Sequence, residues 1–217
     1  MSPSSVIKGV AAPLPFSNLD TDQIMPKQFL RIVDKAGLDQ GLLYDLRFDE
    51  TGAPRPEFVL NQPAYQGKTS ILVAGPNFGC GSSREHAVWG LQQFGIRVII
   101  APSFGEIFFF NALNNGLLLV ALPGDRVDAL LKRVANVASH ELEIDILAGQ
   151  VRAADGWTAT FALSARHRQM FAQGQDMVSA SLQQLDEIAQ YETQHWAQHP
   201  WMKDVAQRVR TRLNTVP

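Results

Sequence analysis

The sequence predicts an α/β fold with a parallel βαβ core, a short β-meander after it and helices toward the C-terminal end. Three observations carry this prediction. Between residues 70 and 134, short apolar runs alternate with segments of helical spacing, which is typical of parallel βαβ units. Three short strand candidates separated by Gly-containing turns follow, as in a meander. Two segments of helical spacing come next.

Each expected element follows from its apolar spacing and from the Gly, Pro, Asn and Asp residues that bound it. The expected strands are residues 6–11, 70–74, 97–101, 116–120, 141–146, 150–153 and 158–163, and the expected helices are residues 84–94, 104–113, 125–134, 165–173 and 181–195.

Residues 26–63 carry no clear period and are interrupted by Gly and Pro. We expect long loops there, with at most one short helix near residues 34–44, and loops of this length are usually functional or mobile. A single domain is expected over residues 1–195. Residues 196–217 are expected to form a helical C-terminal extension, which is locally basic and either solvated or in contact with a partner.

The composition is that of an ordinary globular protein. Of the 217 residues, 46% are hydrophobic and 18% charged, and the net charge of -2 gives no field that would gather nucleic acid. No segment is apolar enough for a membrane span or a secretory signal, so a cytoplasmic location is expected. Cys80 is the only cysteine, and the chain cannot build a thiolate metal site alone.

The densest group of chemically active side chains lies at residues 75–86, where an expected strand gives way to a helix. Such turns lie at the carboxyl edge of a parallel sheet, where ligands of α/β folds bind. One interpretation is structural, because Ser82 and Glu85 have the spacing of a capping box. Ser103 and Glu106 repeat that spacing before the next helix and are also expected to form a cap.

Two glycines and an arginine in the same turn leave alternatives open. Gly79 and Gly81 either permit backbone angles closed to other residues or let a ligand approach the backbone. Arg84 falls in the expected first helical turn, where a cation is disfavoured by the helix dipole. A bound carboxylate would compensate its charge, and a solvated surface arginine is the alternative.

Other ligand motifs do not fit this turn. In a dinucleotide fingerprint the third glycine would fall on Arg84, whose side chain prevents close helix packing. A phosphate loop lacks its Gly-Lys-Ser/Thr, and Ser82 and Ser83 lack the Gly-x-Ser-x-Gly frame of a nucleophile elbow.

The run Gly-Cys-Gly-Ser-Ser-Arg-Glu-His-Ala at residues 79–87 resembles the hallmark of the swivelling domain of aconitase-type enzymes, and most closely that of the 3-isopropylmalate dehydratase small subunits. The resemblance extends to residues 19–26, 101–104 and 111–116, and more loosely to about residue 192. It implies an aconitase swivelling-domain-like fold.

The resemblance also implies a reaction and a partner. Members of this family dehydrate and rehydrate a malate derivative at a [4Fe-4S] cluster, which moves a hydroxyl between neighbouring carbons. The cluster is held by a large subunit, which agrees with the single cysteine of this chain. The resemblance therefore implies a lyase subunit of leucine biosynthesis that binds a small dicarboxylate and is active only with that large subunit.

Carried over residue by residue, the family's catalytic serine matches Ser82, the base that takes a proton from the carbon next to a carboxylate. Ser83 and Arg84 would hold the substrate, and Asn111 matches a position near the site. Asp22 matches an aspartate that faces the large subunit and orients a histidine there. A turn or helix cap is the alternative role for Asp22.

One departure from the family bears on the substrate. Many relatives carry Asp-Trp-Arg where this chain has Asp45, Leu46 and Arg47, in a region that selects the group on the malate skeleton. Arg47 is expected to bind substrate, and the change to leucine leaves open another alkylmalate such as 2-methylmalate or its product citraconate. Two further classes stay open: a non-catalytic carboxylate-binding module and a complete enzyme of another type.

Overall fold

The computed structural model describes residues 5–30 and 36–214. Within the chain, residues Met1–Asp176 form one compact unit and residues Met177–Pro217 a second. This division comes earlier than the expected boundary at residue 195. The physical reason is burial: Met170 and Phe171 in the helix before the division are buried, whereas helices Leu185–Gln198 and Val205–Asn214 after it bury no residue.

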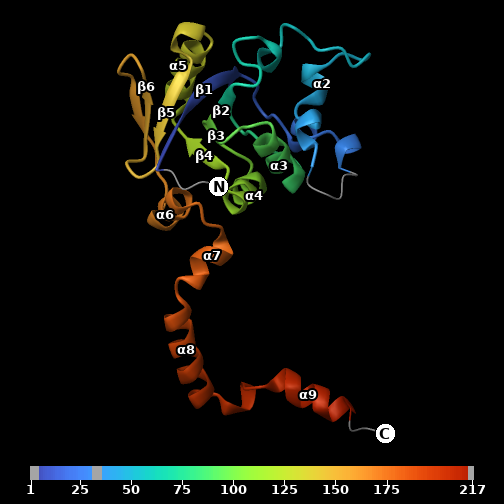
Figure 1. The fold of residues 1–217 in the computed structure, drawn as a ribbon, viewed down its shortest axis with the longest axis vertical. Helices are drawn as coiled ribbons and strands as arrows, with labels where there is room; N and C mark the ends of the chain where they lie inside the picture. Colours follow the sequence, from blue (N-terminus) through green and yellow to red (C-terminus); the bar gives the residue numbers. More distant parts are fainter. Residues whose placement is uncertain (1–4, 31–35, 215–217) are drawn as a thin grey trace. The chain divides into compact units, whose positions relative to one another are not determined.

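A seven-stranded mixed sheet forms the centre of the first unit (Figure 1). Its strand order is β4-β3-β2-β1-β5-β6-β7. Strands β1 to β4 run parallel, and β5 pairs antiparallel with β1 to begin the meander. The strands are β1 Val6–Leu14, β2 Thr69–Ala74, β3 Val98–Ala101, β4 Leu118–Ala121, β5 Glu141–Asp145, β6 Gln150–Ala153 and β7 Thr158–Thr160.

The predicted parallel core and meander are both present, but the sequence did not show that they share one sheet. Strand β1 makes the connection, because it pairs with β2 on one side and with β5 on the other. Its register places Leu14 beside Ala74 at the carboxyl ends of two parallel strands. The loops that follow β1 and β2 therefore meet at one edge of the sheet.

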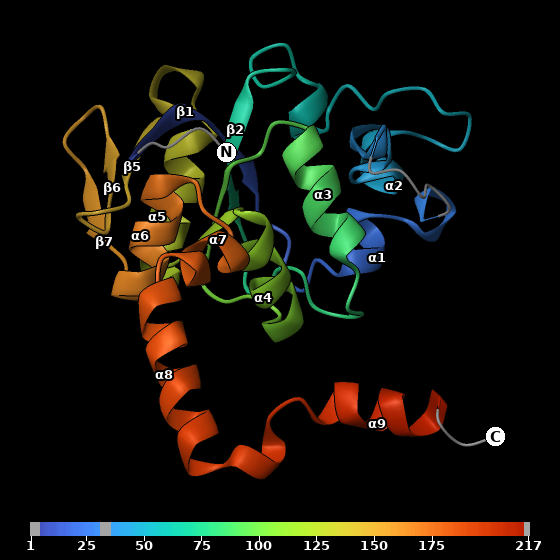
Figure 2. The same ribbon diagram turned by 60° about the horizontal axis from the view of Figure 1, so that its bottom comes forward.

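Helices cover the two faces of the sheet separately (Figure 2). Side chains alternate along each strand, so Leu72 and Ile99 join one apolar core and Ile71 and Val98 join the other. Helix α3 contributes to the first core and α5 to the second, whereas α4 contributes Phe108 to the first and Leu113 to the second. The helices of this unit are α1 Thr21–Ile24, α2 Tyr44–Arg47, α3 Glu85–Gln93, α4 Glu106–Asn115, α5 Gly124–Val134 and α6 Ala165–Gln173.

The long connection between β1 and β2 is irregular, as expected. Its described part contains α1 and α2 and the short 3-10 turns η1 Lys27–Phe29, η2 Leu38–Gly41 and η3 Val59–Asn61. The short helix expected near residues 34–44 corresponds to η2 and the start of α2, and residues 31–35 lie outside the described residues. Leu38 and Leu42 are fully buried against α3, so this connection belongs to the core.

The second unit consists of α7 Met177–Leu182, α8 Leu185–Gln198, a 3-10 turn η5 Pro200–Met202 and α9 Val205–Asn214. The described part of residues 196–217 contains the end of α8, η5 and α9. Within the described chain, no helix combines the length and the apolar character that a membrane crossing requires.

Candidate active site

Three loops meet at the carboxyl edge of the parallel strands. They follow β1, β2 and β3, and the middle one is the signature loop, residues 75–84. Backbone hydrogen bonds hold the signature loop on both sides: the N–H of Gly79 donates to the Leu19 carbonyl at 2.7 Å, and the N–H of Phe78 donates to the Ser103 carbonyl at 3.1 Å. Backbone contacts on two sides therefore fix the path of this loop, which carries Ser82, Ser83 and Arg84.

Gly79 and Gly81, the two glycines of the signature loop, have different roles. Gly79 has φ +73°, and a Cβ there would lie 2.3 Å from Cγ of Phe108 on α4, so only glycine fits. Gly81 has φ +96°, but a Cβ at that position would come no closer than 3.4 Å to any neighbouring atom, the nearest being Oγ1 of Thr21. Close packing explains Gly79, whereas Gly81 is required for its backbone angle, since a Cβ there would make only ordinary contacts with Asp20 and Thr21.

Ser82 is not a helix cap, which corrects the expected capping box. Helix α3 begins at Glu85, with Arg84 at the cap position and no side-chain cap bond. The Ser82 hydroxyl instead lies 3.2 Å from Oγ1 of Thr21, and Thr21 Oγ1 also donates to the Ser82 carbonyl at 3.0 Å. The structural explanation for Ser82 is thereby lost, and its hydroxyl is exposed at the loop surface.

The other half of the expected box, Glu85, bonds elsewhere. Its Oε1 accepts from Nδ2 of Asn115 at 2.6 Å, and Oδ1 of Asn115 accepts from the Trp89 indole at 2.9 Å. This network ties α3 to the end of α4. The second expected box is also wrong, because Oγ of Ser103 accepts from the backbone N–H of Asn77 and α4 begins after Gly105 without a side-chain cap.

Arg84 has a partner that the sequence did not reveal. Its guanidinium forms an ion pair with the carboxylate of Asp22 on α1, and 23% of the Arg84 side chain is exposed against 62% for Asp22. Asp22 is not a cap: Asp20 occupies the cap position of α1, where it forms a capping box with Gln23. Asp22 thus points from the first turn of α1 toward the signature loop.

The arrangement has the features of a carboxylate site. Ser82 and Ser83 are exposed hydroxyls, and Arg84 presents a planar cation beside them. The start of α3 lacks a side-chain cap, and the backbone N–H groups of a helix start attract anions. Donors of three kinds therefore follow one another along the chain where the signature loop enters α3.

The described residues contain no group of three or more His, Cys, Asp or Glu side chains that could hold a metal ion. Cys80 is half-buried in the signature loop, and its Sγ donates to the Asn18 carbonyl at 3.4 Å. One cysteine cannot supply the thiolates of an iron–sulfur cluster.

Comparison with known proteins decides the family. The family model described as the aconitase C-terminal domain matches residues 1–125. The 3-isopropylmalate dehydratase small subunit 1 of Chromobacterium violaceum is 58% identical over 207 residues, which are 95% of this chain and 97% of that protein. The chain belongs to the family of 3-isopropylmalate dehydratase small subunits.

A further relative and a solved structure agree in sequence and in fold. That of Phenylobacterium zucineum is 46% identical over 89% of this chain and 94% of its own length. The crystal structure of 3-isopropylmalate dehydratase from Methanocaldococcus jannaschii matches with a TM-score of 0.60 at 27% identity, covering 86% of this chain and 99% of that one. The predicted α/β, swivelling-domain-like fold is confirmed.

Besides Asp22 on α1, two expected site residues lie on elements outside the signature loop. Arg47 is on α2, where its Nη1 donates to the Asp39 and Leu42 carbonyls at 3.2 and 3.1 Å, and its guanidinium lies over the Phe94 ring at 4.7 Å. Burial lowers the pKa of the Arg47 guanidinium. Asn111 is a half-buried residue of α4, the helix that packs against Gly79 through Phe108.

Thr21 is the residue that sequence reasoning missed. No local signal in the sequence could link Thr21 to Ser82, which is 61 positions away. The contact depends on how the loops after β1 and β2 meet.

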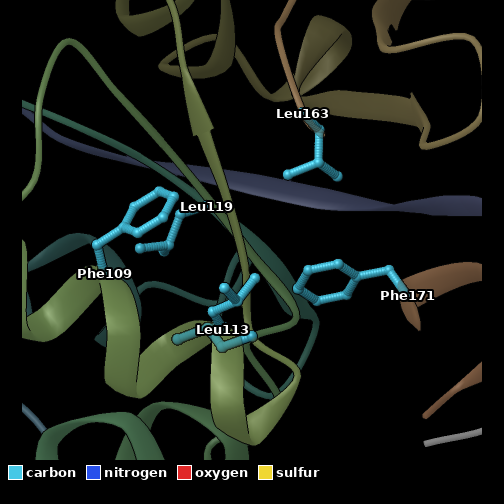
Figure 3. Close-up of a pocket in the computed structure, with 6 residues that line it drawn as sticks. Phe109, Leu113, Leu119, Leu163 and Phe171 are labelled. Atoms are coloured by element: carbon cyan, nitrogen blue, oxygen red, sulfur yellow. The ribbon is translucent and has the colours of Figure 1, made fainter. Parts of the chain in front are cut away.

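An apolar pocket also lies between α4, β4 and α6 (Figure 3). Phe109 and Leu113 on α4 and Phe171 on α6 line it together with three leucines. Because every lining side chain is a leucine or a phenylalanine, the pocket offers no partner for a carboxylate. Its lining residues are Phe109, Leu113, Leu117, Leu119, Leu163 and Phe171.

Proposed function

We propose that this chain is the small subunit of a [4Fe-4S] hydro-lyase that interconverts 2-isopropylmalate and 3-isopropylmalate in leucine biosynthesis. The observation that carries the proposal is the exposed Ser82, which caps no helix and lies beside Arg84 and the start of α3. The proposed location is the cytoplasm.

Ser82 is the proposed base. It takes the proton from the substrate carbon that neighbours a carboxylate, and in the reverse direction it returns that proton. A serine hydroxyl is a poor base at its ordinary pKa, so its alkoxide must be favoured by nearby positive charge and hydrogen-bond donors. The charge of Arg84 and the uncapped amides at the start of α3 support this role.

Arg84 is proposed to bind one substrate carboxylate through both arms of its guanidinium, with Ser83 adding a hydroxyl donor. The ion pair with Asp22 holds the Arg84 side chain beside Ser82 before substrate binds. Asp22 is more exposed than Arg84, so it can also face a partner subunit, where we propose that it orients a histidine of that subunit.

Arg47 and Asn111 are proposed as more distant substrate-binding residues. For Arg47 the geometry supports an indirect contribution, because its Nη1 already donates to two loop carbonyls and so fixes the connection between η2 and α2. Leu46, which stands where many relatives carry tryptophan, packs against the first core. We therefore retain the same chemistry on another alkylmalate, such as 2-methylmalate and citraconate, as a second candidate.

The cluster is proposed to reside on a large subunit. The residues of this chain do not fit the group, since the sequence has one cysteine and the described residues include no set of three potential metal ligands. The relatives' names, which call them small subunits, support a larger partner. This chain would supply the base and the carboxylate contacts, and the partner would complete the site.

Co-expression with a candidate large subunit tests the proposal. The complex should hydrate and dehydrate isopropylmalates, and activity on methylmalate alone would support the second candidate. A stable complex without activity on any alkylmalate, or no complex, would leave a carboxylate-binding module as the better description.

The carboxylate role of Arg84 has its own test. Arg84→Lys in the assembled enzyme should raise KM by about tenfold or more, because lysine keeps the charge but lacks the planar fork. Arg97→Lys, at an exposed position outside the site, is the matched control and should leave KM unchanged. An Arg84→Lys enzyme with the wild-type KM would exclude the bidentate contact.

A further inference from the structure

Thr21 is an unusual residue in this chain because its polar side chain is buried. Only 1% of it is exposed, and Thr69 is the other buried polar residue in the described part of the chain. The hydroxyl of Thr69 donates to the Tyr65 carbonyl four positions away, which is an ordinary local contact. The hydroxyl of Thr21 instead reaches Ser82 across two loops.

The single proton of the Thr21 hydroxyl determines the direction of its bonds. Oγ1 donates that proton to the Ser82 carbonyl at 3.0 Å. At the contact of 3.2 Å between the two hydroxyl oxygens, Ser82 must then be the donor and Thr21 the acceptor. In this state Thr21 orients the Ser82 hydroxyl by accepting its proton.

The Ser82 carbonyl has a second donor, the backbone N–H of Arg84 at 2.8 Å. Thr21 can therefore turn its proton from this carbonyl to Oγ of Ser82 without leaving the carbonyl unpaired. That rotation is useful only when Oγ has lost its proton, because an alkoxide accepts and cannot donate. A hydrogen bond to an ionised acceptor is about twice as strong as a neutral one.

Backbone hydrogen bonds hold Thr21 against the signature loop, beside Ser82. Its N–H donates to the Cys80 carbonyl at 2.8 Å, and its own carbonyl accepts from the N–H of Met25 at 3.0 Å. The Asp20 capping box fixes the turn of α1 that contains it. The position of Oγ1 is thus set by backbone contacts with the signature loop and not by the side chain alone.

We propose that Thr21 is a positioning residue for Ser82, and that it stabilises the Ser82 alkoxide by donating to it. This inference rests on the proposed function, because it assigns Thr21 a part in the base chemistry of Ser82. The proton balance is as follows. Ser82 Oγ first gives its proton to solvent water, and Thr21 donates to the alkoxide. The alkoxide then takes up the proton that the substrate carbon loses, the Thr21 hydroxyl returns to the Ser82 carbonyl, and rehydration returns the proton from Ser82 to carbon.

The test uses the assembled enzyme with Thr21→Val, which keeps the shape and removes the hydroxyl. We expect kcat to fall about ten- to a hundredfold with KM changed less than about threefold, since a hydrogen bond to a charged group is lost only when the alkoxide forms. The alkaline-rising limb of the kcat–pH profile should move upward by about one pH unit, because the alkoxide is less stable.

Three variants show whether the effect is chemical or structural. Thr21→Ser keeps the hydroxyl and should restore kcat and the pH profile to near wild type. Thr69→Val is the matched control for loss of a buried threonine hydroxyl and should reduce stability without moving the profile. Should Thr21→Val fail to fold, Thr21→Cys, with its weaker donor, should show a smaller shift in the same direction.

The titratable or charged side chains around this pair are Asp20 and Asp22 on α1 and Cys80 and Arg84 on the signature loop. All four are unchanged in the Thr21 variants, so a shift between variants is attributable to Thr21. An unshifted profile with wild-type kcat in Thr21→Val would overturn the inference.

The outcome for Thr21 is separable from the outcome for Ser82. If Ser82→Ala keeps activity, the proposed function of Ser82 fails, and with it the basis of the inference. If Ser82→Ala abolishes activity while Thr21→Val behaves as wild type, the proposed function survives and only the inference on Thr21 is lost.

Discussion

Gly79 is the position at which the structure makes its sharpest prediction for stability. Gly79→Ala adds one methyl group at φ +73°, 2.3 Å from Cγ of Phe108. The left-handed backbone costs an alanine about 1–2 kcal/mol. Overpacking against the Phe108 ring, which is buried between α4 and the signature loop, adds about 1–3 kcal/mol. The expected loss in the free energy of unfolding is therefore about 2–5 kcal/mol.

Gly67→Ala is the matched control for Gly79→Ala. Gly67 has φ +67°, but no atom lies within 4 Å of a Cβ there, so only the backbone cost of about 1–2 kcal/mol applies. Urea unfolding followed by far-UV circular dichroism measures both. With a slope of about 3 kcal/mol per M, a loss of about 3 kcal/mol lowers the midpoint by about 1 M.

The comparison of the two midpoints tests the packing of the signature loop against α4. A midpoint for Gly79→Ala equal to that for Gly67→Ala would refute the clash with Phe108. The signature loop would then not be seated on α4 as described, and the placement of Ser82 would lose its support.

Further predictions concern the elements around the site. Asn115→Ala should cost about 2–3 kcal/mol of unfolding free energy by breaking the link between α3 and α4, and the exposed Asn114→Ala, its control, should stay within about 0.5 kcal/mol of wild type. The hydrogen bond from Lys8 lowers the pKa of Glu143, so Glu143→Gln should be less stable than wild type at neutral pH, and the difference should vanish in acid titrations as pH falls through the folded-state pKa. Arg47→Lys should lower the melting temperature by about 2–8 °C, and an unchanged value would show that its carbonyl contacts contribute little.

Periodicity identified the strands and helices of the core because each is determined by residues near one another in the chain. The strand expected at residues 70–74 is β2, and the helix expected at residues 84–94 is α3, with ends that differ by one residue. The place of β1 was not predictable in the same way. Its pairing with both β2 and β5 joins segments far apart in sequence, and only the assembled sheet shows it.

Local spacing was misleading where tertiary contacts compete with helix caps. Ser82 and Glu85 have capping-box spacing, yet Glu85 bonds Asn115 and Ser82 bonds Thr21. Both partners come from other elements, and each replaces a cap bond worth about 1 kcal/mol. Asp20 and Gln23 do form a capping box, and both of its bonds stay within the first turn of α1.

Arg84 has a different meaning in the structure from the one its place in the sequence suggested. Its positive charge at a helix start predicted a bound carboxylate as one of two alternatives. In the structure the carboxylate of Asp22, in the same chain, compensates that charge. Arg84 is therefore not evidence for a ligand by itself. Ser82 is the better evidence for a ligand site, because it caps no helix and its exposed hydroxyl has no structural role except the contact with Thr21.

The central claim is that this chain provides one half of an active site whose base is Ser82. The most direct measurement titrates the chain into a fixed amount of the cluster-loaded large subunit and follows dehydration of isopropylmalate. Wild-type chain should restore activity to a saturating level, and Ser82→Ala should compete for the same partner while restoring none. Full activity with Ser82→Ala, or no activity with a wild-type chain that binds the partner, would contradict the claim.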